Sequence, residues 1–189
     1  MGPYYLTALV SMIGCVKSVS GMTEKSFSER TITSKPKFGQ KIEVEVPTHV
    51  NGLLRFQNGA IGNIITSFDV WGSSLPRIEV YGTRGSIIAP DPNTFGGEVM
   101  LKQYFDKDFN LYPLTGIYSE NSRGIGLSDM ANCIIEGRCN NRASGNLGLH
   151  VLEIMEAIHK SSDEKREIDL ISSCEIPKPL SIDLTKGEV

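Results

Sequence analysis

Two glycine-containing turns divide the stretch from Thr48 to Ala89 into short segments rich in Val, Ile, Leu, Phe and Thr. The first turn is Asn58-Gly59, and both residue types tolerate the positive φ that a type I′ hairpin turn needs at its two central positions. The second turn is Gly82-Thr83-Arg84-Gly85. We therefore predict two antiparallel hairpins in one sheet, on which the rest of the chain must pack.

Alternation along the first hairpin places apolar residues on both faces of its strands. Leu53 shares a face with Arg55, while Ile61 and Ile65 share a face with Asn63. Strands of this two-sided kind are typical of sheets that are covered on both faces. We expect helices on one face and another subunit on the other.

The segments around the hairpins predict the order helix, strands, two helices and tail. The predicted elements are a helix over Pro3–Gly14, a strand over Val16–Thr33 bulged near Gly21-Met22, extended Lys41–Val46, a strand over Glu98–Gln103, irregular Lys107–Tyr118, helices over Gly124–Gly137 and Gly145–Ser161 with Ser144 as N-cap, and a short strand at Glu167–Leu170. This order predicts one domain, residues 1–189, of α+β class with an open, mostly antiparallel sheet and helices on one face.

Composition excludes several classes of function. The net charge is −3 and the 19 basic residues are scattered, so nucleic acid is not an expected partner. No apolar run approaches the ~20 residues that a membrane span needs, and the apolar run Tyr4–Ile13 is not preceded by the basic segment of a signal peptide. Because that run starts so abruptly, we expect the chain to begin inside a larger protein.

The cysteines indicate an intracellular chain without a metal centre. Cys15, Cys133, Cys139 and Cys174 form no CxxC pair and no His pair follows them at zinc-site spacing. We expect reduced, mostly buried thiols in a cytoplasmic protein and no metal site.

No catalytic motif is complete, so the candidate site residues are argued one by one. Gly124-Ile125-Gly126 opens a helix and either cradles an anion with its N–H groups or is a plain loop. Tyr4 and Tyr5 head the first helix, where a phenol can donate a proton to a carbonyl oxygen or simply pack. Trp71 either lines a sugar site or plugs the end of the sheet.

Three further polar residues have both a functional and a structural interpretation. Arg123 and Asp129 flank the start of the Gly124–Gly137 helix and either bind substrate hydroxyls or belong to the helix start, where a carboxylate in the first turn suits the helix dipole. His150 lies at the edge of the apolar stripe of the long helix, a place that favours a hydrogen-bonded packing residue over a catalyst.

Six segments in order resemble one known family. MGPYYLTALVSMIG, THVNGLLRFQNGAIGNIITSFDVW, IEVYGTRGSI, PDPNTFGG, RGIGLSDMANCIIEGR and HVLEIMEAIHKSS together resemble the C-terminal domain of the glucose–fructose oxidoreductase / inositol dehydrogenase family, Gfo/Idh/MocA. The resemblance covers nearly all 189 residues. It implies an N-terminal Rossmann domain for NAD or NADP outside this chain, and a C-terminal sheet whose helical face frames the substrate and whose other face supports oligomers.

The resemblance also assigns roles to residues. In the family an Asp is followed four residues later by His or Tyr, and Tyr4 occupies the second of these positions, so it is expected to act as an acid/base or hydrogen-bond donor at the substrate carbinol. Arg123, Asp129 and His150 are expected to line the substrate pocket, and Trp71 is a further substrate-binding candidate from its own place in the sequence. No cofactor is expected on the isolated chain, because the dinucleotide fingerprint and the Glu-Lys-Pro motif would precede Met1.

The expected function is therefore the substrate-binding and oligomerisation domain of an NAD(P)-dependent oxidoreductase acting on a sugar, cyclitol or related polyol. The isolated chain is expected to be inactive. Two alternatives remain at this point: a non-catalytic sugar-binding or regulatory homologue, and a sheet-mediated dimerisation module without a ligand.

Overall fold

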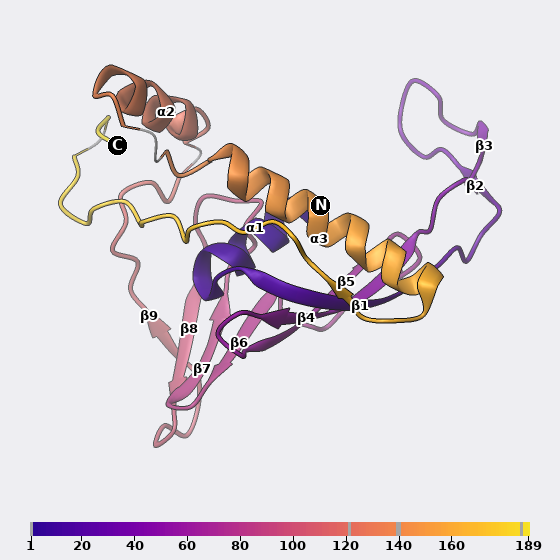
Figure 1. Ribbon diagram of the computed structural model, residues 1–189, viewed down its shortest axis with the longest axis horizontal. Coiled ribbons are helices and arrows are strands. Elements are labelled where there is room, and N and C mark those ends of the chain that lie inside the picture. The colour runs from indigo at the N-terminus through magenta and orange to yellow at the C-terminus, as the bar shows by residue number, and fades with distance from the viewer. Residues whose placement is uncertain (1, 121, 139–140, 186) are drawn as a thin grey trace.

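The computed structural model describes residues 2–120, 122–138, 141–185 and 187–189, so Cys139 of the cysteine prediction lies outside the described residues. The described residues form three helices and three antiparallel sheets (Figure 1). The helices are α1 (Gly2–Ile13), α2 (Ile125–Ile135) and α3 (Gly145–Glu164). This confirms the α+β class and all three predicted helices.

Two four-stranded sheets carry the fold. The first has the order β10 (Ile168–Asp169), β1 (Val16–Glu24), β4 (His49–Phe56), β5 (Ile61–Ser67), and the second has the order β6 (Ile78–Gly82), β7 (Gly85–Ala89), β8 (Val99–Gln103), β9 (Asn110–Tyr112). A separate hairpin joins β2 (Glu29–Thr31) to β3 (Lys41–Glu43).

Both predicted hairpins form, but the prediction of one common sheet is wrong. The β4–β5 hairpin belongs to the first sheet and the β6–β7 hairpin to the second. Residues 68–77 between them contain Gly72 and Pro76 and carry no strand. Proline lacks the N–H that a sheet ladder needs, so this segment separates the two sheets.

The first turn also differs from the predicted type I′ geometry. Only Gly59 has a positive φ, of 89°, and Gly59 N–H donates to Phe56 O at 3.0 Å while Phe56 N–H donates to Ala60 O at 2.9 Å. This is the pattern of a three-residue loop closed by a glycine bulge. The Asn58 side chain is used elsewhere, because its amide donates to Ile13 O at 2.9 Å and so ties the turn to the end of α1.

The predicted strand Val16–Thr33 divides into β1 and β2, and its bulge lies between Val16 and Ser18 rather than at Gly21. Gly21 pairs in regular register with Gly52. A Cβ on Gly21 would lie 2.4 Å from the Ile158 carbonyl oxygen, and one on Gly52 would lie 2.8 Å from Ile158 Cδ1. The two glycines therefore let α3 approach the first sheet closely, which is their structural use here.

The core lies between α3, α1 and one face of the first sheet (Figure 1). Ser144 caps α3 as predicted, since its hydroxyl accepts from Leu147 N–H at 3.2 Å. The fully or nearly buried core residues are Leu6, Val10, Val16, Val19, Leu54, Phe56, Ile64, Leu147, Val151, Ile154, Ala157, Ile158 and Ile168.

The opposite face of the first sheet is open. Leu53, Ile61 and Ile65 are exposed there beside Arg55, as the alternation predicted. The C-terminal arm after β10 has no regular secondary structure over residues 170–180 and runs back along α3 towards α2 (Figure 1). Within the part of the chain that the structure describes, no helix has the length and apolar character needed to cross a membrane.

Candidate substrate site

The loop of residues 90–97, which joins β7 to β8, is fastened to α1 through one carboxylate. Tyr5 OH donates to Asp91 Oδ1 at 3.0 Å, and Asn93 N–H donates to the same oxygen at 2.9 Å. The other carboxylate oxygen, Oδ2, lies 3.8 Å from Arg77 Nε. Asp91 thus connects α1, the segment before β6 and its own loop.

Two glycines shape the far end of this loop. Gly97 has a φ of 127°, and a Cβ on it would lie 2.5 Å from Pro90 Cβ. A Cβ on Gly96 would lie 2.3 Å from the Ser119 carbonyl oxygen. The loop therefore folds back on itself and packs against the segment that leads to α2, an arrangement that only glycine permits.

Two open cavities border the loop. The larger, of about 540 Å³, is lined by Asn93 to Gly97 together with Ser119, Glu120 and Arg123. The Arg123 guanidinium carbon lies 5.8 Å from the centre of the Phe95 ring, within the range of a cation–π contact. The smaller, of about 250 Å³, is more apolar and includes Ala8 and Met12 of α1. Thr94, Phe95 and Gly96 line both cavities.

The larger cavity suits a polar ligand of small size. Its wall offers an arginine, a carboxylate, an amide and hydroxyls beside one aromatic face. Hydroxyl-bearing ligands are recognised by such groups, which donate and accept hydrogen bonds while an aromatic ring covers the apolar C–H surface.

Tyr5 is held as a protonated phenol. Burial raises its pKa, and the hydrogen bond and negative charge of Asp91 raise it further, while the positive charge of Arg77 acts in the opposite direction. Tyr5 consequently keeps its proton and remains a hydrogen-bond donor to Asp91 in neutral solution.

Of the five residues predicted for the site, Arg123 lines the larger cavity. Tyr4 projects from α1 next to Tyr5 and is 46% exposed, so its phenol is open to a ligand or a partner. Trp71 is 96% exposed in the segment between β5 and β6. Their roles in substrate binding stay predictions.

Asp129 and His150 lie in the interior. Asp129 Oδ2 accepts from Arg142 N–H at 2.7 Å and its other oxygen pairs with the Arg142 guanidinium. The expectation that Asp129 lies in the first turn of its helix is wrong, because α2 begins at Ile125 and has no acidic residue in that turn. Its carboxylate instead holds the connection between α2 and α3.

Both ring nitrogens of His150 are engaged. Val16 N–H donates to Nε2 at 3.0 Å, and Nδ1 lies 2.9 Å from Ser172 Oγ. The side chain has no exposed surface, and burial lowers its pKa although the nearby Glu153 carboxylate acts against that shift. Among the described residues, no hydrogen bond or ion pair joins any two of the five predicted site residues.

The sequence reasoning missed Asp91 and Arg77. A signal for Asp91 was present in the Pro-Asp-Pro-Asn run, because Asp two residues before Asn favours a turn in which the carboxylate accepts a backbone N–H. No local signal pairs Asp91 with Tyr5, since the two are 86 residues apart in the sequence.

A dinucleotide cradle does not fit the described part of the chain. All strand pairings that the structure describes are antiparallel, whereas a Rossmann-type cradle needs a parallel β-α-β unit. Gly124, the N-cap residue of α2, has a φ of 103°, and its role as part of an anion cradle stays a prediction.

Comparison with known proteins gives a partial sequence match to one family and several solved structures of similar fold. Residues 1–88 match the GFO/IDH/MocA C-terminal domain, whereas no curated protein matches the chain. Solved structures of similar fold include levoglucosan dehydrogenase in its apo form, with 21% identity and a TM-score of 0.71 over 92% of this chain and 51% of that chain. Aldose-aldose oxidoreductase from Caulobacter crescentus complexed with glycerol has 23% identity and a TM-score of 0.65 over 89% and 46%.

An NAD binding oxidoreductase from Klebsiella pneumoniae gives 19% identity and a TM-score of 0.68, covering 91% of this chain and 50% of that chain. The present chain thus spans about half the length of the solved structures that it matches. These identities establish a shared fold. The chain is therefore similar to the GFO/IDH/MocA C-terminal domain in sequence over residues 1–88, and it shares its fold with levoglucosan dehydrogenase over 92% of its length.

Proposed function

We propose that this chain supplies the substrate-binding part of an NAD(P)-dependent oxidoreductase that acts on a CH–OH group of a sugar, cyclitol or related polyol. The observation that carries the proposal is the polar cavity of about 540 Å³ formed by residues 93–97 and Arg123, on a loop fastened to α1 through Tyr5 and Asp91. The fold is also shared with levoglucosan dehydrogenase, whose structure is known with NADH and levoglucosan.

In this proposal each residue has a distinct task. Arg123 donates hydrogen bonds to substrate hydroxyls, and the exposed phenol of Tyr4 exchanges a proton with the oxygen of the reacting carbinol. Tyr5 and Asp91 position the loop and do not react. Trp71 offers an exposed aromatic face against which a sugar ring can stack.

The cofactor, NAD or NADP, accepts or supplies hydride and is held by a domain outside these residues. We also propose that the whole protein carries out this hydride transfer and that it is located in the cytoplasm. The isolated chain should bring no turnover, because the antiparallel sheets described here provide no dinucleotide cradle.

The test uses the full open reading frame that encodes this chain. NAD(P)H absorbance is followed with a panel of sugars and cyclitols, first for the wild type and then for Tyr4→Phe. Loss of a general acid/base should lower kcat by roughly 10²–10⁴-fold. Tyr112→Phe, an exposed tyrosine on β9, is the matched control and should leave kcat unchanged.

Three results would contradict parts of this proposal. Absence of turnover with every substrate, combined with measurable sugar binding, would favour a sugar-binding or regulatory protein of the same fold. Absence of both turnover and binding would reject the proposal that this chain forms a substrate site. An unchanged kcat for Tyr4→Phe in an active enzyme would remove Tyr4 from the mechanism and leave the substrate class intact.

A second function, dimerisation through the first sheet, is favoured by a separate observation. The open face of β4 and β5 exposes Leu53, Ile61 and Ile65 side by side, with Ile61 paired to Arg55 in the register. Apolar patches of this kind mark interaction surfaces. The molar mass of the wild type should rise with concentration, and Ile61→Lys should shift it towards that of a monomer. A wild type that stays monomeric at high concentration would reject this function.

A further inference from the structure

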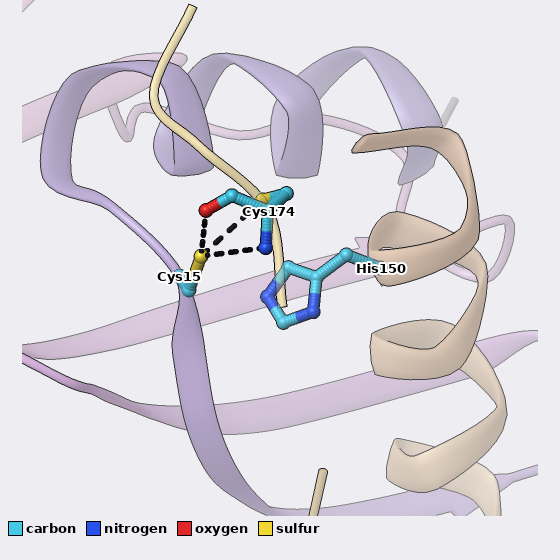
Figure 2. A group of neighbouring side chains, drawn as sticks. All are labelled: Cys15, His150 and Cys174. Carbon is cyan, nitrogen blue, oxygen red and sulfur yellow. Dashed lines mark hydrogen bonds between the residues drawn. The ribbon is translucent and has the colours of Figure 1, made fainter. Parts of the chain in front are cut away.

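Two sulfur atoms lie in contact where the C-terminal arm passes the junction of α1 and β1. Cys15, just before β1, and Cys174, in the arm, are 159 residues apart, yet their Sγ atoms are 3.3 Å apart (Figure 2). Cys174 N–H donates to Cys15 Sγ at 3.1 Å, and Cys15 Sγ donates to the Cys174 carbonyl oxygen. Both are free thiols in this structure.

His150 lies beside the two sulfurs, and the ligand atoms of the three residues are within 4.8 Å of one another (Figure 2). A metal centre would nevertheless lack its nitrogen ligand. The Ser172 hydroxyl donates to Glu153, so it accepts from Nδ1–H of His150, and the Nε2 lone pair accepts from Val16 N–H. Binding a metal would leave a buried backbone N–H without a partner, which is costly.

We propose that Cys15 and Cys174 form a reversible disulfide that staples the C-terminal arm to the junction of α1 and β1. A peroxide is the oxidant. The thiolate form of one of the two cysteines attacks one oxygen of hydrogen peroxide, giving a sulfenic acid and hydroxide. The sulfur of the other cysteine then attacks the sulfenic sulfur, the S–S bond forms, and water leaves. Over both steps two thiols and one peroxide give one disulfide and two waters.

The backbone of Cys174 fixes the position of Cys15 Sγ. The Cys174 N–H donates to this sulfur, and the Cys174 carbonyl oxygen accepts from it. Burial raises the pKa of Cys174 to about 12, and the hydrogen bond and charge of Cys15 contribute to that shift. Cys174 therefore keeps its proton in neutral solution while both thiols are reduced.

The arm is already held in place on both sides of Cys174. Glu153 accepts from Ile171 N–H and Ser172 N–H, each at 2.8 Å. Further along, Arg142 Nε donates to Lys178 O at 2.9 Å. A disulfide needs an S–S distance of about 2.05 Å, so bond formation requires a local movement of only about 1.3 Å. Because these non-covalent contacts already hold the arm beside Cys15, bond formation does not have to order the arm first.

The test is mass spectrometry of this chain after treatment with hydrogen peroxide. Cys133→Ser and Cys139→Ser are combined so that only Cys15 and Cys174 remain. The intact monomer should lose the mass of two hydrogen atoms, its tryptic peptides holding Cys15 and Cys174 should be linked, and dithiothreitol should reverse both changes. A further substitution in this double variant, either Cys15→Ser or Cys174→Ser, should abolish the linked peptide.

A second measurement tests the staple itself. Closing a loop of this length restricts the unfolded chain, so Tm of the oxidised form should exceed that of the reduced form by roughly 5–15 °C. Two thiols that stay open to alkylation after oxidation, or a sulfinic acid at Cys15 in place of the linked peptide, would overturn the proposal. So would an oxidised form whose Tm is no higher than that of the reduced chain.

Discussion

The two four-stranded sheets of this domain differ in how well they are covered. Every residue of the main core cluster comes from α1, α3 or the first sheet. In the second sheet, whose four strands are fully described, Ile78 alone is buried, and Tyr81, Leu111 and Tyr112 are more than half exposed. The first sheet therefore has one face packed in the core with α1 and α3, whereas most of the second sheet is partly or fully exposed.

This difference places the candidate site on the weakly covered part. The loop of residues 90–97 leaves the end of β7, and it is attached to the strongly packed part through Tyr5 of α1. A rigid scaffold that holds a less stable loop is the usual arrangement of ligand sites. The contrast between the two sheets can be tested by substitutions placed in each.

The largest expected effect comes from truncating a buried aromatic side chain of the first sheet. Phe56 is fully buried, so Phe56→Ala should lower the free energy of unfolding by about 3–5 kcal/mol, measured by urea denaturation. Tyr81→Ala in the second sheet is the control, and its effect should stay within about 0.5 kcal/mol, because Tyr81 is 75% exposed. Similar losses for both variants would show that the two sheets contribute equally.

A smaller effect should follow from adding a single methyl group between α3 and the first sheet. Gly21→Ala places a Cβ 2.4 Å from the Ile158 carbonyl oxygen, and overpacking of this kind costs about 1–3 kcal/mol. Gly116→Ala, where nothing lies within 4 Å, is the matched control and should change stability by less than about 0.5 kcal/mol. Thermal unfolding separates the two, and an unchanged Tm for Gly21→Ala would mean that the helix moves away freely.

The sequence predicted the features that depend on neighbours in the chain. Alternation identified the two faces of β4 and β5, the Ser144 cap marked the start of α3, and the apolar stripe of α3 is buried as expected. The bulge at Gly21 was misplaced because a glycine in a strand indicates either a bulge or a close approach, and only the position of Ile158 decides between them.

The candidate site was harder to predict because its contacts are long-range. Arg123 was named from its place before a helix, and its role in binding stays a prediction. The contacts of Asp91 depend on Tyr5, and those of His150 depend on Val16 and Ser172. A pattern within one segment shows which face a residue occupies. It does not show which distant polar group will satisfy that residue, so alternatives for Asp129 and His150 stayed open until the fold was known.

The buried His150 makes the stability of the strongly packed part depend on pH. Its pKa is lowered in the folded state, so the unfolded chain binds more protons as pH falls below the ordinary value of about 6.5. The free energy of unfolding should therefore be unaffected by His150 above that pH. Below it, this free energy should fall by up to about 1.4 kcal/mol per pH unit, until the pH passes the pKa of His150 in the folded state. Urea unfolding between pH 7 and 5 measures this slope.

His150→Gln should remove the slope, and His49→Gln should keep it. His49 serves as the control because it is a partly exposed residue of β4 whose ring forms a hydrogen bond with Ser67. A wild type whose stability is flat over this range would mean that His150 is protonated without cost in the folded state, and the interior of the first sheet would then be more polar than its packing indicates.

The smallest expected effect lies in the β2–β3 hairpin. Neither of its strands has a buried residue, so it is even less covered than the second sheet. Lys41 Nζ lies 2.6 Å from Glu29 Oε1, with both side chains largely exposed. A double-mutant cycle with Lys41→Ala and Glu29→Ala should give a coupling energy of about 0.2–1 kcal/mol that decreases in high salt. A coupling above about 2 kcal/mol, retained in salt, would mean that water is excluded from this ion pair, and the hairpin would then have to be covered in solution by another part of the protein or by a partner.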